Sequence, residues 1–382
     1  MNRDLDIVRA RIYAVTPPDT PPYRWTGQDG FVRITDNLLR LTAANGLEGW
    51  ASNTSNAPHE DGAGEPERSA ADRLHVIAPQ IIGASALERE AVSERLLRTC
   101  DDPRRRAESL IDIALWDLMA RAAGQPLWQM LGGTRDVLPA YASTPVLETV
   151  EAYVAYVGDL ADRGYQAAKL HTQCDPEWDL AMIDAVHAAH GKRMRFMLDV
   201  EQRYDLRTAV RVGQRLTELG FVWFEAPLPD ADFVAYRELR RAIGVPVIPA
   251  GNTLTSLEDL QSGIEAGAWD HVRTGPSHNG GITGSIRAMG LAAANGMTVE
   301  LQSYGYEGRK LAALHLALGL GNCGWFEQPV AESDYAYELA DPPQVDAAGL
   351  IHAPTGPGLG AVPDWERIEA EAFLTFDLGD DL

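Results

Sequence analysis

The second half of the chain repeats one unit, a short apolar run with β-strand character followed by an amphipathic helical pattern. Eight such runs occur from residue 138 onward: LPAYAS, YQAAKLH, MRFMLDV, VWFEAP, VPVIPAG, HVRTGP, TVELQS and CGWFEQP. The polar residues near their ends recur roughly every 23 to 30 positions. Strands and helices that alternate at this spacing predict a (β/α) barrel of about 200 residues, whose functional groups lie at the carboxyl ends of the strands.

The first 130 residues follow another pattern. DIVRARIYAV is rich in β-formers, and FVRITDNLLRLTAANGLEGWAS alternates around Asn45-Gly46, a strong hairpin signal. From about Ala71 the period becomes helical, and SLIDIALWDLMARAAGQPLWQMLGG predicts one helix that stops at its final Gly-Gly. An antiparallel sheet followed by helices indicates an α+β domain.

These patterns divide the chain into two expected domains. We expect residues 1–130 to form the α+β domain and residues 131–339 to form the barrel. The tail from about 340 to 382 is expected to return to the first domain with a final strand or helix.

The charge of the chain excludes several classes of partner. Lys and Arg number 33 against 55 Asp and Glu, which gives a net charge of -22. Nucleic acids and anionic membrane surfaces need clustered cations, so neither is expected as a partner. No apolar run approaches the roughly 20 residues that span a bilayer, and the amino terminus does not resemble a signal peptide. Three widely spaced cysteines fit reduced thiols. We therefore expect a cytoplasmic protein.

Three successive strand runs end in side chains that carry oxygen. Asp199 closes RFMLDV, Glu225 closes VWFEAP, and Asn252 follows VPVIPAG. Each could simply cap the helix that follows it. Because three such residues recur in register, we favour convergence on one hard cation, and Mg²⁺ prefers this ligand set with positions left for water and substrate.

Lys169 and His171 occupy alternate positions of the strand run YQAAKLH, so both point into the barrel. A single histidine at a strand end is more often structural, but a neighbouring lysine favours proton transfer. We expect each of the two groups to lower the pKa of the other by like-charge repulsion.

Together these residues resemble the enolase superfamily, in its mandelate racemase and muconate lactonizing enzyme branch. The resemblance covers nearly the whole chain. It rests on the helix IDIALWDLMARAAGQPLWQMLGG, the strand-end series described above, the GGIT at 280–283 and the closing PTGPGLG. It implies an α+β capping domain on a modified TIM barrel, (β/α)₇β, with Mg²⁺, or Mn²⁺ as an alternative ion. It also implies abstraction of the proton α to a substrate carboxylate and a homo-oligomer, dimeric or octameric.

Two positions near the expected metal depart from the family pattern. The family commonly has Lys-x-Lys on the second strand, and here the second position is His171. The base would then be His171, with Lys169 as its electrostatic partner. The third metal ligand is often Glu, whereas Asn252 is similar to enzymes of the glucarate dehydratase type.

The opposite face departs further. Many relatives carry a His-Asp dyad there, but Gly275 and Gln302 occupy the two positions. Glutamine is no general base. Racemisation is therefore disfavoured unless Tyr304 or His278 supplies a second base. One base can run a syn dehydration, or a cycloisomerisation in which a ring oxygen leaves.

The remaining candidate residues would bind substrate. Gln302 and Tyr304 would form hydrogen bonds with hydroxyl groups. Glu327 resembles the acidic group that the family places near the substrate carboxylate, although a salt bridge at the barrel rim is an equal alternative.

The loop from Pro17 to Gly30 is expected to be a specificity lid. Tyr23, Arg24 and Trp25 lie in it between proline and glycine clusters. Arg24 could pair with a second carboxylate or with polyol oxygens, while the aromatic residues could equally pack on the barrel rim.

The sequence therefore predicts a Mg²⁺-dependent lyase that dehydrates a sugar acid, an aldonate or an aldarate, to a 2-keto-3-deoxy acid. An isomerase of the same family, either a cycloisomerase or a racemase or epimerase, is the alternative. A sugar-acid-binding protein without catalysis is the third hypothesis.

Overall fold

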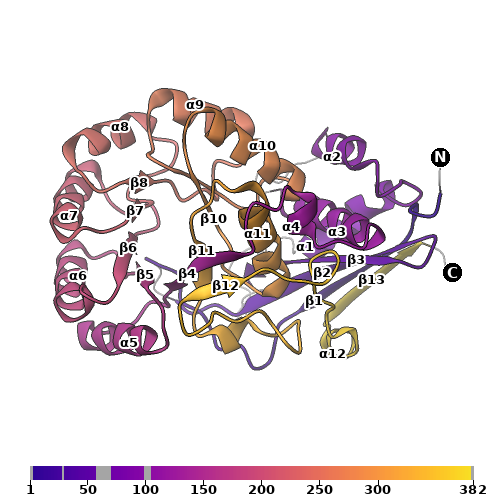
Figure 1. Ribbon diagram of the computed structural model, residues 1–382, viewed down its shortest axis with the longest axis horizontal. Coiled ribbons are helices and arrows are strands. Elements are labelled where there is room, and N and C mark those ends of the chain that lie inside the picture. The colour runs from indigo at the N-terminus through magenta and orange to yellow at the C-terminus, as the bar shows by residue number, and fades with distance from the viewer. Residues whose placement is uncertain (1–2, 28–29, 57–69, 99–104, 380–382) are drawn as a thin grey trace.

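The protein is described by a computed structural model that covers residues 3–27, 30–56, 70–98 and 105–379. An open antiparallel sheet with its helices lies beside a barrel surrounded by helices (Figure 1). The expected fold class, an α+β capping domain with a modified TIM barrel, is confirmed. No helix of the described ranges is both long enough and apolar enough to cross a membrane.

The antiparallel sheet contains the first and the last strand of the described residues. Its strand order is β13-β1-β2-β3. The strands are β1 (Ile7–Val15), β2 (Ile34–Ala43), β3 (Glu48–Asn56) and β13 (Leu374–Gly379). The predicted hairpin joins β2 to β3: Gly46 has a φ of +81°, and the Leu47 amide donates to Asn45 Oδ1 at 3.0 Å. A positive φ suits the Asn-Gly pair that marked this turn.

The helices that follow are α1 (Ala70–Ile77), η1 (Ala78–Gln80), α2 (Arg89–Arg98), α3 (Arg106–Ala122) and α4 (Leu127–Met130). The single long helix expected before Gly133 is therefore wrong, because α3 and α4 are separate. Between them Gly124 has a φ of +66°, and Pro126 precedes α4. Proline has no amide hydrogen and its ring would clash with the preceding turn, so the helix ends before it.

Eight parallel strands form the barrel, one for each predicted run. They pair in the order β11-β4-β5-β6-β7-β8, with β9-β10 as a further pair. Their bounds are β4 (Val137–Ser143), β5 (Ala167–His171), β6 (Arg195–Asp199), β7 (Phe224–Glu225), β8 (Val247–Ile248), β9 (Val272–Thr274), β10 (Val299–Leu301) and β11 (Phe326–Pro329).

The barrel helices alternate with these strands and lie outside them (Figure 1). They are α5 (Val150–Asp162), α6 (Pro176–His190), α7 (Leu206–Leu219), α8 (Phe233–Ala242), α9 (Leu257–Ala266), α10 (Gly281–Ala294) and α11 (Glu307–Leu320). Local signals fix their ends: on α7 the Asp205 side chain caps the first turn, and Gly220, with a φ of +70°, closes the last.

The last part of the chain returns to the first sheet. It contains η2 (Glu332–Tyr335), β12 (Leu350–His352) antiparallel to β4, and α12 (Trp365–Glu371). Strand β13 then pairs antiparallel with β1. Both described cysteines, Cys174 and Cys323, are free thiols, and Cys100 lies outside the described residues.

The GGIT segment joins the two parts of the molecule. The Thr283 amide and hydroxyl donate to the Asp112 carboxylate at 2.9 and 2.6 Å, and Trp116 Nε1 donates to Thr283 Oγ1 at 2.9 Å. Gly281 has a φ of +81°, and a Cβ there would lie less than 3.0 Å from Asp112. The motif therefore lets the start of α10 meet a carboxylate of α3.

Candidate active site

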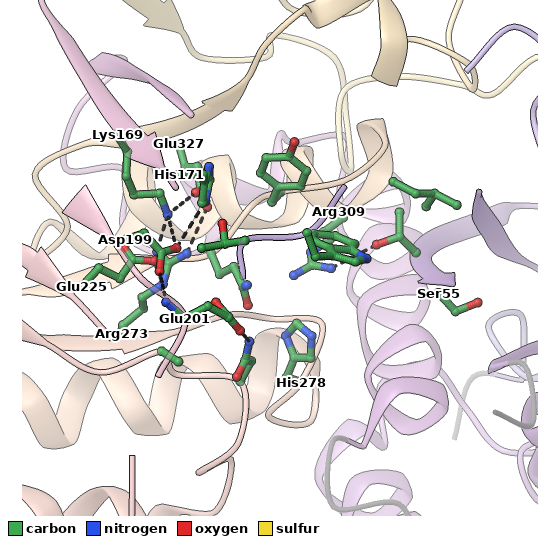
Figure 2. A pocket seen from close by; sticks show the side chains of 18 of the residues that line it. Ser55, Lys169, His171, Asp199, Glu201, Glu225, Arg273, His278, Arg309 and Glu327 are labelled. Atoms are coloured by element: carbon green, nitrogen blue, oxygen red, sulfur yellow. Dashed lines mark hydrogen bonds and ion pairs between the residues drawn. The ribbon is translucent and has the colours of Figure 1, made fainter. Parts of the chain in front are cut away.

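Strand register brings the predicted residues together. His171 pairs with Asp199 across β5 and β6, and Asp199 pairs with Glu225 across β6 and β7. Paired residues of neighbouring strands lie at one level, so these side chains share the carboxyl-terminal edge of the barrel. They line a cavity of ≈ 290 Å³ between the barrel and the first sheet (Figure 2).

Lys169 lines this cavity and is fully buried. Its Nζ atom lies 2.8 Å from Glu225 Oε1, 2.7 Å from Glu327 Oε1 and 3.8 Å from Asp199 Oδ2. Burial and nearby Arg273 act to lower the pKa of Lys169, but the three carboxylates outweigh them and raise it. The expected lowering of this pKa by His171 is therefore wrong, because the carboxylates dominate. Lys169 is held as a cation.

His171 is fixed from behind. Its Nδ1 atom lies 2.6 Å from the Thr144 carbonyl oxygen, which accepts only, so Nδ1 carries a hydrogen. The Nε2 atom lies 3.2 Å from Asp199 Oδ2 on the cavity side. Burial acts to raise the pKa of Asp199, but the contact with His171 and the charge of Lys169 hold it below its ordinary value. The ring is thus oriented so that Nε2 faces the cavity.

The three predicted metal ligands, Asp199, Glu225 and Asn252, all line the cavity. The structure adds Glu201, whose Oε1 accepts from Asn252 Nδ2 at 3.3 Å. Enclosure of Glu201 and the charge of Asp199 raise its pKa. The signal that could have found it is the sequence Asp-Val-Glu, because alternate residues of a strand run share one face, although β6 itself ends at Asp199.

Charge balance provides the test of the predicted Mg²⁺ site. Four carboxylates line this end of the cavity, those of Asp199, Glu201, Glu225 and Glu327. The cationic side chains that pair with them are Lys169 and Arg273. When all four carboxyl groups are ionised, they exceed these cations by two charges, which one divalent cation would neutralise. Carboxylate and amide oxygens are also the donors that Mg²⁺ prefers. The residues present therefore fit the ion.

The carboxylate of Glu225 is engaged on both oxygens. Oε1 accepts from Lys169 and lies 3.0 Å from Arg273 Nε, while Oε2 accepts from Trp223 Nε1 at 3.1 Å. Within the described ranges, no three His, Cys, Asp or Glu side chains already form a metal-binding group. Burial and the other carboxylates raise the pKa of Glu225 to about 7 in spite of Arg273 and Lys169.

Sequence reasoning missed Arg273, a residue of the apolar run HVRTGP on β9. It is buried inside the barrel, with its guanidinium 3.0 Å from Glu225 and 3.4 Å from Glu327. The one available signal was an arginine inside an apolar strand, which is rarely buried without a partner.

Glu327 lies on β11 and is completely enclosed. Its carboxylate accepts from Ser143 Oγ at 3.0 Å and the Ser303 amide at 3.1 Å, besides its contact with Lys169. Burial acts to raise its pKa, but Lys169 and Arg273 lower it below the ordinary value. The structure thus places an ion pair inside the barrel rather than at the rim, and substrate contact by Glu327 stays a prediction.

Aromatic side chains form part of the cavity wall. Trp25 and Tyr304 line it, with ring centroids 5.8 Å apart. Tyr23 packs behind them, 4.4 Å from Trp25 and 5.3 Å from Tyr304, and is not among the lining residues. Tyr304 shares a 2.7 Å hydrogen bond with Tyr335, and burial raises its pKa well above the ordinary value. Tyr304 is therefore a poor candidate for the second base.

The expected lid meets the barrel directly. The Gly27 amide donates to the Thr172 carbonyl at 3.3 Å, just beyond β5. Arg24, by contrast, is half-buried and does not line the cavity. Residues 28 and 29 of the expected lid lie outside the described residues.

Gln302 and His278 also line the cavity, and His278 lies on the side away from Lys169 (Figure 2). Gln302 Oε1 is buried, and no donor of the described residues reaches it. Gly275 leaves space here, since a Cβ would lie 3.0 Å from the Gln302 carbonyl oxygen. His278 borders the same cavity on the loop before α10.

Two sequence profiles match the chain over these elements. The profile described as the mandelate racemase/muconate lactonizing enzyme N-terminal domain matches residues 30–132, and the enolase C-terminal domain-like profile matches residues 152–367. The chain belongs to the enolase superfamily, in its mandelate racemase/muconate lactonizing enzyme branch.

Relatives within this superfamily catalyse different reactions. An L-talarate/galactarate dehydratase of Salmonella typhimurium is 34% identical over 193 residues, which cover 50% of this chain and 48% of that enzyme. An N-succinylamino acid racemase of Amycolatopsis sp. is 28% identical over 93% of this chain and 94% of its own. A D-galactarolactone cycloisomerase of Agrobacterium fabrum is 25% identical over 92% of this chain and 93% of its own. The chain is thus an enzyme of the superfamily, and the reaction that is catalysed differs from one relative to another.

Solved structures share the whole fold. A Pseudovibrio sp. protein assigned to the mandelate racemase/muconate lactonizing enzymes superposes with a TM-score of 0.93 at 32% identity, covering 98% of this chain and 99% of its own. A D-glucarate dehydratase from Agrobacterium tumefaciens, complexed with magnesium, superposes with a TM-score of 0.80 at 26% identity. The match covers 97% of this chain and 100% of that one. Magnesium therefore occurs within the family.

Four residues without glycine's freedom have left-handed backbone at the strand ends of the site. They are Cys174, Glu201, Gln202 and Ala226, with φ between 42° and 64°. Such conformations cost about 1–3 kcal/mol each and gather at functional sites of folded proteins. In this superfamily member they follow β5, β6 and β7, the strands that carry His171, Asp199 and Glu225.

Proposed function

We propose that the enzyme dehydrates a sugar acid to a 2-keto-3-deoxy acid, with His171 as base and then acid on one face of the substrate. The observation that carries this proposal is the orientation of His171. Its Nδ1 is tied to the Thr144 carbonyl, and its Nε2 faces the cavity beside Asp199. Gln302 also lines the cavity, and its amide cannot take up a proton at neutral pH.

Lys169 is assigned an electrostatic role. Because Glu225 and Glu327 hold it as a cation, it cannot accept a proton near neutrality. It supplies positive charge beside the position of the reacting carboxylate. Mg²⁺ held by Asp199, Glu225 and Asn252 would supply the further charge that makes the α-proton acidic enough to remove.

The proton inventory of the reaction closes with one base. His171 Nε2 takes the proton from the α-carbon, and the electron pair of that C–H bond shifts toward the carboxylate. The β-carbon then loses its hydroxyl group, which leaves as water with the proton returned by His171. The resulting enol tautomerises to the 2-keto-3-deoxy acid. Gln302 and Tyr304 would orient the remaining hydroxyl groups.

The relatives support this reaction class. The enzymes from Salmonella and from Agrobacterium tumefaciens are dehydratases of six-carbon sugar diacids by their names. Expected assembly as a dimer or an octamer remains part of the proposal, as does a cytoplasmic location.

A second candidate function rests on His278. This histidine borders the cavity on the side away from His171 (Figure 2), so a second proton donor could serve the other face. Two bases on two faces would permit racemisation or epimerisation. The racemase among the relatives belongs to this reaction type.

One experiment separates these functions. The enzyme with Mg²⁺ is incubated with a panel of aldonic and aldaric acids, and products are assayed as 2-keto acids. The same panel in D₂O is examined by NMR for α-deuterium in recovered substrate. Keto acid that appears with wild type and His278→Asn but not with His171→Asn supports the dehydratase. Deuterium exchange or epimerisation without keto acid, abolished by His278→Asn, would favour the isomerase instead.

A further inference from the structure

The far end of the cavity carries a cation of its own. Arg309 lies on the first turn of α11, across the cavity from Lys169 and Asp199 (Figure 2). It is 5% exposed. Arg106, at the start of α3, also lines the cavity.

Arg309 is joined to the first sheet by one hydrogen bond, in which Nη1 donates to Thr54 Oγ1 at 3.1 Å. Its Nε atom is buried without an acceptor among the described residues. Within those residues no carboxylate lies within 4.0 Å of the guanidinium, whereas Arg273 at the other end meets two. Burying a cation without a counter-charge is costly, so this arrangement indicates that a ligand supplies the missing anion.

The surroundings of Arg309 agree. Burial lowers its pKa to about 10; Glu327 opposes this effect, while Arg273 and Arg106 add to it. Gly305 leaves room for the Arg309 side chain, because a Cβ at residue 305 would lie 3.0 Å from Arg309 Cδ and 3.1 Å from Thr54 Cγ2. A purely structural link to Thr54 needs only one donor and leaves Nε unexplained.

The cavity is therefore bipolar. Within the described residues, carboxylates exceed cations around Asp199 and Glu225, whereas no carboxylate lies within 4.0 Å of the Arg309 guanidinium. A cavity of ≈ 290 Å³ is at the small end of ligand pockets, which suits a short polyhydroxy acid reaching from one pole to the other.

We propose that Arg309 binds a second carboxylate, at the end of the substrate away from the reacting one, so that the enzyme takes aldarates in preference to aldonates. This inference rests on the proposed function for the orientation of the substrate. Nε and Nη of one guanidinium form the fork that matches a carboxylate with two hydrogen bonds. Arg24, the residue expected from the sequence for a second carboxylate, is not at the cavity wall.

The test compares acids that differ only at the far end. Binding is measured by calorimetry with Mg²⁺ and the His171→Asn variant, which blocks turnover, using the pairs galactarate and galactonate, D-glucarate and D-gluconate, and further stereoisomeric pairs. We expect at least one diacid to bind about 30-fold or more tighter than its monoacid, the loss typical of an unpaired buried charge. Adding Arg309→Met should abolish the difference by weakening the diacid alone. Arg309→Lys should retain part of it, and the exposed control Arg207→Met all of it.

Equal affinity of diacid and monoacid in every pair would overturn the proposal. It would also be overturned if none of the diacids bound. Equal weakening of both members by Arg309→Met would show a structural role. If Arg309→Met does not fold, the paired comparison in the His171→Asn background and in Arg309→Lys still decides. The two proposals fail separately. Tight diacid binding without keto acid from the active enzyme refutes only the dehydration, and keto acid formed equally well from both members of each pair refutes only the role of Arg309.

Discussion

His171 and Asp199 are paired across neighbouring barrel strands, with His171 Nε2 3.2 Å from Asp199 Oδ2. This contact joins the proposed base to a proposed metal ligand. Strand register alone thus places the proposed base and a proposed ligand of the ion that would acidify the α-proton at one level of the barrel.

Replacing His171 by Asn should remove the base while retaining a side chain of similar polarity. We expect kcat to fall by about 10²- to 10⁴-fold, the usual contribution of a positioned general base. Mg²⁺ affinity should change little. Steady-state kinetics on an acid identified by the panel, with calorimetric Mg²⁺ titration, provides the measurement. Full turnover by His171→Asn would show that another group is the base.

Replacing Lys169 by Met should destabilise the fold as well as impair activity. The change leaves Glu225 and Glu327 without a buried cation that lies 2.8 and 2.7 Å away. Removing one partner of a buried ion pair typically costs about 3–5 kcal/mol. Urea unfolding at pH 7.5 checks this value against Lys192→Met, an exposed lysine on the same barrel, which should change stability by less than about 0.5 kcal/mol. Similar stabilities of the two variants would contradict the buried network.

Magnesium should stabilise the folded protein through Asp199. At a free Mg²⁺ concentration of 100 times Kd, the free energy of unfolding should rise by about 2.7 kcal/mol, and EDTA should reverse the change. Asp199→Asn should lose this response. Asp205→Asn is the matched control, because it removes an exposed acid from the α7 cap and asparagine caps equally well. A Mg²⁺ response that is the same in both variants would exclude Asp199 as a ligand.

The sequence predicts those parts of the site that local patterns encode. Asp199 and Glu225 each close an apolar strand run, and adjacent parallel strands must bring such ends together. Arg273 was missed because its partners lie on β7 and β11, and only closure of the barrel places them around it. Arg309 and Thr54 meet across 255 positions of sequence and two different parts of the fold, which no periodicity signals.

Local competition explains the error in the helix prediction as well. The hydrophobic period runs on through residues 106–130, yet Gly124 and Pro126 interrupt the backbone between α3 and α4. The turn is then stabilised from a distance, because the Leu127 amide donates to the Gly358 carbonyl at 2.8 Å. The hydrophobic period of the side chains predicts one helix, whereas the hydrogen bonds of the backbone form two. The helix boundaries follow the backbone hydrogen bonds.

Gly281 should be intolerant of any side chain. Alanine there would adopt a φ of +81° and place Cβ less than 3.0 Å from the Asp112 carboxylate, so Gly281→Ala should lose about 2 kcal/mol or more of stability. Gly290 lies on the same helix, and a Cβ added there would meet no atom within 4 Å. Gly290→Ala should therefore be neutral or stabilise by up to about 1 kcal/mol. Equal effects of the two substitutions in thermal unfolding would contradict the packing at the GGIT segment.

His315 should make the protein lose stability in mild acid. It is buried on α11, where its Nδ1 accepts from the Trp128 amide at 2.9 Å, so protonation of Nδ1 would break that bond. Burial lowers its pKa from 6.5 to about 4, although a hydrogen bond involving Leu359 opposes the shift. Between these two pKa values the unfolded chain binds the proton and the folded chain does not. The free energy of unfolding must then fall as pH decreases through this window, by about 2 kcal/mol between pH 8 and pH 5 from this residue.

The variant His315→Asn isolates this effect, since Asn Oδ1 takes the place of the acceptor atom and does not titrate. The variant is expected to be less stable than wild type at pH 8 because the ring is lost. The test compares how much the free energy of unfolding of each protein changes between pH 8 and pH 5. Urea unfolding at pH 8 and pH 5 should show a loss about 2 kcal/mol smaller in the variant than in wild type. Buried acids with raised pKa values, such as Asp112 at about 6, act in the opposite direction in both proteins and cancel in the difference. Parallel slopes would mean that His315 is protonated, or solvated, in the folded enzyme.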